Sequence, residues 1–98
     1  MTRDQAILCY NLFEGDRDSD VTIFSNKMLV SRKQHTCVVC REDIAPKTRV
    51  RAQTERDNDD KIVMTFYVCE TCCSAIVELV LRGNDEPIST RAALGMGK

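Results

Sequence analysis

Two Cys-x-x-Cys pairs constrain this chain more than any other feature of its sequence. Cys37 and Cys40 form the first pair, Cys69 and Cys72 form the second, and residues 41–68 separate them. Two thiolates three positions apart can converge on one small cation, and two such pairs complete the tetrahedral sulfur shell that Zn2+ accepts. We therefore expect these four cysteines to hold one structural zinc ion.

The length of the chain supports a role for a metal in folding. A chain of 98 residues makes a single domain, and a hydrophobic core of that size is often marginal. The sequence has no Trp, so Val, Ile, Leu and Met must build the core. Zinc binding contributes roughly 10 to 16 kcal/mol of coupled folding free energy in small domains at neutral pH.

Six cysteines also raise the alternative of a disulfide framework in a secreted protein. The N-terminal residues contain no continuous apolar segment followed by a small-residue cleavage site, and no apolar run is long enough to cross a bilayer. We therefore predict a cytoplasmic protein with reduced thiols on zinc and no membrane association.

The first part of the chain, residues 1–26, is predicted to be an extension made of a helix and a β-hairpin. Thr2 and Gln5 have the spacing of a capping box, and the apolar residues that follow, Leu12 and Phe13 among them, continue a short helix. After an acidic loop, two strands at 21–24 and 28–30 are expected, joined by a turn at Ser25-Asn26.

Residues 27–83 are predicted to form the zinc-binding core. Residues 50–54 and 62–68 alternate as strands do and flank a polar turn, which indicates a hairpin. From about Thr71 the apolar period becomes helical, and Arg82 with Gly83 are stop signals. Residues 84–98 are predicted to be a flexible tail with at most one helical turn at 89–94.

The order of a knuckle, a hairpin and a helix that carries the second cysteine pair in its first turn resembles a treble-clef zinc finger. The fold class expected is therefore α+β. Residues 32–40, with Ile44, Pro46 and Thr48-Arg49 after them, resemble small phage and prophage treble-clef proteins of unassigned function. Lys47 stands where that group often has Gly. The resemblance implies a fold and a viral source, and hence a host cytoplasm, but no activity.

Rubredoxin is the main alternative for the metal, because its iron site also uses two Cys-x-x-Cys pairs. In this chain no Gly follows Cys40 or Cys72, there is no Trp, and the second pair begins a helix. Tetrahedral sulfur sites accept zinc or iron, and these departures favour zinc.

Three further residues have reactive side chains whose predicted roles are structural. Cys73 falls in the apolar stripe of the predicted helix, and Cys9 is expected to pack the opening helix in the same way. His35 is the only histidine, which disfavours an HNH-type nuclease, and we expect it to cap the knuckle or pack beside it. Asp16-x-Asp18-x-Asp20 begins like a calcium loop but lacks the Gly and Glu that such a loop needs.

Charge is distributed unevenly along the sequence. The formal net charge is −1, and four thiolates with one zinc ion would lower it to −3. Residues 27–56 nevertheless carry a balance of +5, while each flank carries −3. The cations considered as contacts for a partner or a nucleic acid are Arg32, Lys33, Lys47, Arg49 and Arg51.

Two functions from different classes follow from these patterns. The first is a non-enzymatic protein-interaction module, a small phage-type accessory protein that binds and modulates a host protein. The alternative is a regulator that binds duplex DNA through Lys47, Arg49 and Arg51. A third interpretation is that these cations lie on a solvent-exposed strand face that binds nothing. Enzymatic activity is not expected, because four cysteines would leave the metal no open position. The sequence leaves the oligomeric state open.

Overall fold

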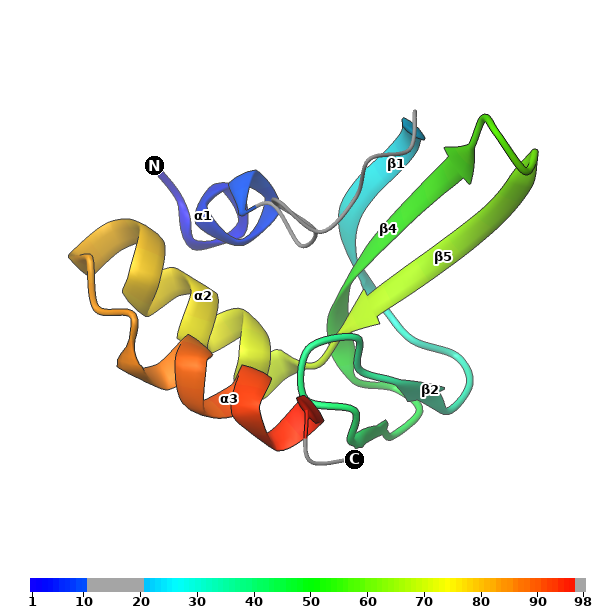
Figure 1. Cartoon of the computed structure of the whole chain (residues 1–98). Coiled ribbons are helices and arrows are strands. Elements are labelled where there is room, and N and C mark those ends of the chain that lie inside the picture. Colours follow the sequence, from blue (N-terminus) through cyan, green and yellow to red (C-terminus); the bar gives the residue numbers. More distant parts are fainter. Residues whose placement is uncertain (11–20, 97–98) are drawn as a thin grey trace.

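The computed structural model describes residues 1–10 and 21–96 and shows a small α+β fold (Figure 1). A three-stranded antiparallel sheet is combined with helices and a short two-stranded ribbon. In chain order the elements are α1 (Arg3–Cys9), β1 (Val21–Val30), β2 (His35–Thr36), β3 (Asp43–Ile44), β4 (Arg49–Asp57), β5 (Ile62–Val68), α2 (Glu70–Arg82) and α3 (Glu86–Met96).

The three-stranded sheet has the order β1-β4-β5, and β2 pairs with β3 in the small ribbon. The predicted hairpin is confirmed as β4 and β5, in which Arg51 lies opposite Val68 and Asp57 lies opposite Ile62. Its turn is closed by the Asp57 carboxylate, which accepts a hydrogen bond from the backbone N–H of Asp59 at 2.9 Å. The sequence pattern therefore identified this hairpin correctly, and the structure adds its register.

The predicted hairpin at residues 21–30 is wrong, because these residues form the single strand β1. β1 pairs with β4 along its whole length, with a register shift between Ile23 and Ser25. The polar pair Ser25-Asn26 suggested a turn, but the Asn26 side-chain amide makes two hydrogen bonds within the fold. It donates to the Leu8 carbonyl at 2.8 Å, and its oxygen accepts from Arg51 at 3.0 Å. The predicted boundary at residue 26 thus falls inside a strand.

Helix α1 lies against the face of the sheet from which Arg51 projects. The predicted capping box is present, since the Thr2 hydroxyl accepts from the Gln5 backbone and the Gln5 side chain accepts from the Thr2 backbone. Arg49 and Arg51 both project from β4 toward this helix. The apolar residues Leu12 and Phe13 and the acidic loop at 16–20 lie outside the described residues.

The buried core joins the sheet, α2 and the cysteine pairs. Helix α2 ends as predicted at Gly83, whose φ of 68° is the left-handed conformation that glycine favours and whose N–H bonds back to α2. Ile76 and Cys73 of α2 are fully buried, whereas Leu81 is 48% exposed. The fully or nearly fully buried apolar side chains in this cluster are Ile7, Cys37, Cys40, Ile44, Val50, Val68, Cys72, Cys73, Ala75, Ile76 and Ile88.

Residues 86–96 form the helix α3, which is longer than the single turn predicted for this segment. The Asn84 side chain accepts from the Glu86 backbone at 3.3 Å at the start of the helix, and Ile88 is buried. Near its end, a Cβ added at Gly95 would collide with the carbonyl oxygen of Val39. Gly95 therefore allows α3 to lie directly on the backbone of the first cysteine knuckle, next to α2 (Figure 1). Among the described residues, no helix is long and apolar enough to cross a membrane.

Candidate metal centre

The first cysteine pair is held by the tight turn between β2 and β3. The Cys37 N–H donates to the Glu42 carbonyl at 2.9 Å, and the Arg41 N–H donates to the Cys37 carbonyl at 2.9 Å. Arg41 adopts a φ of 64°, which lets the chain reverse directly after Cys40. The turn thus presents the Cys37 and Cys40 sulfurs on the same side.

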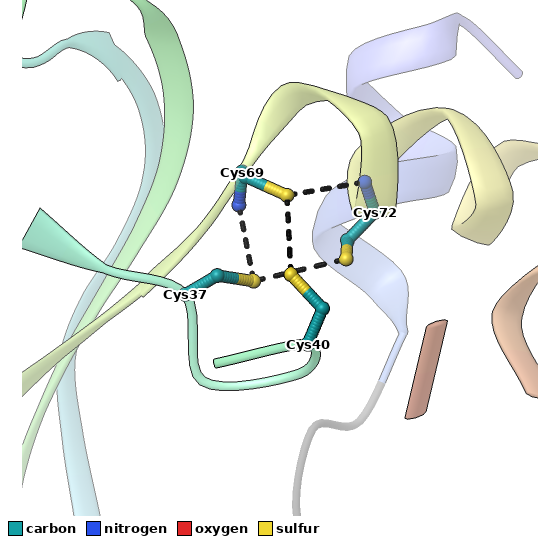
Figure 2. Close-up of side chains that lie close together, drawn as sticks. All are labelled: Cys37, Cys40, Cys69 and Cys72. Atoms are coloured by element: carbon teal, nitrogen blue, oxygen red, sulfur yellow. Dashed lines mark hydrogen bonds between the residues drawn. The ribbon is translucent and has the colours of Figure 1, made fainter. Parts of the chain in front are cut away.

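The second pair is held by the N-terminus of α2. Cys69 is the N-cap residue, and its sulfur accepts from the Cys72 N–H at 3.5 Å. The Cys69 N–H in turn donates to the Cys37 sulfur at 3.4 Å, which links the two pairs (Figure 2). A helix N-terminus stabilises thiolates through its unpaired N–H groups and its positive dipole end. The sequence predicted this environment for Cys69 and Cys72.

The four sulfurs converge on one point, as Figure 2 shows. The Cys37 and Cys72 Sγ atoms are 3.7 Å apart, the Cys40 and Cys69 Sγ atoms are 3.8 Å apart, and all four lie within 4.8 Å of one another. A disulfide would need about 2.05 Å, so these are four separate sulfurs. A tetrahedron with Zn–S bonds of about 2.3 Å has edges of about 3.8 Å. The sulfur spacing therefore fits one zinc ion.

Electrostatics also favour a cation among these sulfurs. Hydrogen bonds from the Cys69 and Cys72 thiols, and from the backbone N–H of Cys69, lower the pKa of Cys37 well below its usual range. Once Cys37 is a thiolate, its hydrogen bond with Cys72 raises the pKa of Cys72, and the pKa of Cys69 is raised in the same way. Negative charge on one sulfur thus disfavours negative charge on its neighbours, and a bound dication would offset this repulsion among the four thiolates.

Arg91 on α3 contacts three of the four sulfurs and was not identified from the sequence. Its guanidinium donates to the Cys40 sulfur at 3.2 Å and to the Cys72 sulfur at 3.4 Å, and lies 3.9 Å from the Cys69 sulfur. It also forms an ion pair with Glu42 at 3.5 Å. These contacts raise the pKa of Arg91, with the Cys72 contact as the largest cause. Because the spacing of Arg91 to the cysteines carries no motif, only the docking of α3 revealed it.

The three other reactive side chains lie outside the sulfur cluster. Cys73 is fully buried as predicted, its thiol lies 3.6 Å from the Val68 carbonyl, and burial raises its pKa to about 11. Cys9 is exposed, and its thiol contacts the Ala6 carbonyl at 3.3 Å. The prediction that Cys9 packs in the core is therefore wrong. His35 packs beside the knuckle as predicted, stacked on Tyr67 with ring centroids 3.8 Å apart.

The basic residues considered as partner contacts are dispersed by the fold. Arg51 is 1% exposed and its guanidinium donates to the Ile7 carbonyl at 2.8 Å. Arg49 forms a bidentate ion pair with Asp4, which lowers the Asp4 pKa. Lys47 has a φ of 64°, the conformation for which glycine is the usual residue, and its N–H donates to the Ser31 carbonyl at 2.7 Å. Arg32 and Lys33 are exposed and line a separate groove.

The sequence matches no protein-family model, no curated protein and no solved structure. The geometry characterises the site as a largely buried four-cysteine cluster in a small α+β fold, compatible with one zinc ion.

Proposed function

We propose that this protein is a non-enzymatic treble-clef zinc finger that acts as a protein-interaction module. The observation that supports the metal part is the closed set of four sulfurs within 4.8 Å of one another. Four thiolates complete the coordination of structural zinc and leave no position for water or substrate. Bound zinc would supply a cross-link between the knuckle and α2, with Arg91 offsetting part of the negative charge of the thiolates.

The order of elements around the cluster supports the treble-clef assignment. The knuckle at residues 37–40 is followed by the hairpin β4–β5, and the second pair lies at the N-terminus of α2, with Cys69 as the N-cap and Cys72 in the first turn. β1 adds a third strand to the hairpin. In this proposal, the N-terminal segment is an integral part of the sheet around a zinc-finger core.

Exposed apolar side chains at the end of the sheet far from the cysteines support a protein partner. Ile23, Phe24, Ile62, Val63 and Met64 are each between 50% and 57% exposed. We call these five residues the apolar end. β5 is an edge strand, and from Ile62 to Val68 it carries no charged side chain. An uncharged apolar edge strand is a template for pairing with an extended segment of another protein.

The partner we propose is a host protein, and the setting is the host cytoplasm. This part rests on the resemblance to small phage-encoded zinc-binding proteins and on the six cysteines, none of which is paired in a disulfide, as suits a reducing compartment. A small accessory protein that modulates a larger host factor needs one docking surface and no active site. The apolar end provides such a surface.

Binding of duplex DNA through Lys47, Arg49 and Arg51 has less support. Arg51 is buried and Arg49 is held by Asp4, which leaves only Lys47 of the three for a phosphate. Phosphate contacts need several accessible cations for useful affinity. We therefore place the protein partner first.

Site-specific photocrosslinking in the expressing host tests the proposal. A benzoylphenylalanine placed at Val63 should give one discrete adduct with another protein, and Met64→Lys in the same chain should abolish it. The matched control is the same probe at Leu81, which is 48% exposed on α2, against 56% for Val63. Equal adducts from both positions, no adduct from Val63, or an adduct only with a second copy of the chain would each contradict binding of a host protein at the apolar end.

A further inference from the structure

One face of the three-stranded sheet carries cations and hydroxyl groups but no carboxylates. Residues directly opposite one another in neighbouring strands share a face, and residues alternate between faces along each strand. By this register Lys27, Ala52 and Tyr67 form one row, and Ser25, Thr54 and Thr65 form the next. The hydrogen bond of 2.9 Å between the Thr54 and Thr65 hydroxyls agrees with this placement. Arg56 follows on the same face, which we call the open face.

The acidic residues of the sheet lie on the opposite face. Glu55 and Asp57 alternate with Thr54 and Arg56 along β4, and Glu55 is 3% exposed on the side that α1 covers. Helix α1 covers this side, where its Leu8 and Ile7 carbonyls accept from the Asn26 and Arg51 side chains. Among the described strand residues, the open face therefore combines the positive charge of Lys27 and Arg56 with polar hydroxyls.

A groove at the knuckle end of the open face is also lined by cations and by no acidic residue. It has a volume of about 540 Å³ and is lined by Leu29, Val30, Arg32, Lys33, His35 and Tyr67. His35 and Tyr67 stack within it, with an angle of 12° between the ring planes. Of these lining residues none is acidic, and Arg32 and Lys33 are exposed. The groove thus offers two cations beside a flat aromatic pair.

We propose that the groove and the open face together bind single-stranded nucleic acid. Lys27, Arg32, Lys33 and Arg56 contact phosphates, and one base extends the stack of His35 and Tyr67. Phosphate backbones attract Lys and Arg regardless of sequence, and an aromatic ring stacks any unpaired base. In a duplex the flat faces of the bases are already stacked, so the aromatic pair selects a single strand. This site differs from the duplex contacts considered on the sequence. It meets the apolar end only at Val63, which lies opposite Arg56 in β5.

The slightly negative net charge of the chain means that only a local group of cations can attract a nucleic acid. The chain has a formal net charge of −1, so it has no general attraction for polyanions. Binding would therefore depend on the local group of cations. Neutralising these cations should have a much larger effect than neutralising others elsewhere on the protein.

Fluorescence anisotropy with zinc-loaded protein and labelled 12-nucleotide strands of mixed sequence tests the site, with RNA, DNA and a duplex of the same sequence as separate arms. The double variant Arg32→Gln/Lys33→Gln should bind single strands roughly tenfold more weakly, and the salt slope should fall by about 1.4, since each single-strand phosphate contact contributes about 0.7. The matched control is Lys61→Gln/Arg82→Gln, which removes the same charge from exposed positions outside the open face. This control should change binding by less than about twofold.

The aromatic contact has its own test. Tyr67→Leu should weaken binding roughly tenfold, whereas Tyr67→Phe, which keeps the ring, should bind like the parent protein. Zinc content and circular dichroism establish that each variant is folded. Three results would overturn the proposal: no saturable single-strand binding at low salt, equal weakening by the two double variants, or a duplex bound as tightly as the single strands. The difference between the RNA and DNA arms identifies which sugar the site prefers.

Discussion

Arg51 lies at the centre of a buried polar network, and its removal gives the sharpest test of the packing of α1 on the sheet. Its guanidinium donates to the Ile7 carbonyl at 2.8 Å, to the Asn26 side chain at 3.0 Å and to the Gln53 side chain at 2.8 Å. The residue is only 1% exposed, and burial lowers its pKa. All three acceptors use this one side chain as a donor, and the Ile7 carbonyl also accepts from the Tyr10 N–H at 3.4 Å.

The change Arg51→Met keeps most of the apolar stem and removes all three donors. A buried acceptor left without a partner costs about 1 to 3 kcal/mol. The Ile7 carbonyl keeps the Tyr10 N–H, so the cost falls mainly on the Asn26 and Gln53 oxygens, and we expect a loss of about 2 to 5 kcal/mol. Domains have a total stability of about 5 to 15 kcal/mol, so this loss would be a large fraction of it.

Urea denaturation followed by circular dichroism measures this loss, with free zinc held constant because bound metal adds to the apparent stability. The control Arg49→Ala breaks an ion pair whose side chains are 46% and 41% exposed, and it should shift the urea midpoint only slightly because solvent screens the pair. Arg51→Lys should not restore stability, since one ammonium cannot reach three separated acceptors as the planar guanidinium does. A loss below about 1 kcal/mol for Arg51→Met would refute the buried network.

Four further predictions follow from the metal centre and its surroundings. Cys72→Ser should abolish stoichiometric zinc binding and cooperative unfolding, whereas Cys9→Ser should leave both unchanged; elemental analysis decides, and metal loss in the Cys9 variant would contradict the ligand set. Arg91→Ala should speed zinc transfer to a chromogenic chelator roughly tenfold, and an unchanged rate would show that its sulfur contacts do not matter. Gly95→Ala should displace α3 from the knuckle, seen as faster amide exchange in α3, and unchanged exchange would disprove this packing. Lys47→Gly should stabilise the protein by about 0.5 to 1 kcal/mol in urea denaturation, because its φ of 64° strains a side chain, and a loss of stability would contradict that reason.

Local patterns predicted several elements of the fold correctly. Alternation on both sides of a polar turn identified β4 and β5, and a 3.6-residue period ending at Gly83 identified α2. The capping box at Thr2 and Gln5 was also predicted correctly. Each of these signals is complete within a few neighbouring residues, so the sequence alone shows it. The prediction of two strands in 21–30 was wrong because a polar pair such as Ser25-Asn26 is typical of a turn. In the fold, Asn26 instead forms hydrogen bonds with Leu8 and Arg51, which are distant in sequence.

The sequence by itself determined the four converging cysteines, because their spacing and the geometry of zinc leave few other arrangements. Only the tertiary structure decided which face of each element is covered. Arg51 at a strand position looks like a solvent-facing cation until α1 covers it, and Arg91 has no motif until α3 brings it to the sulfurs. The physical reason is that burial and charge pairing depend on the docking of segments far apart in the chain, which local periodicity does not encode.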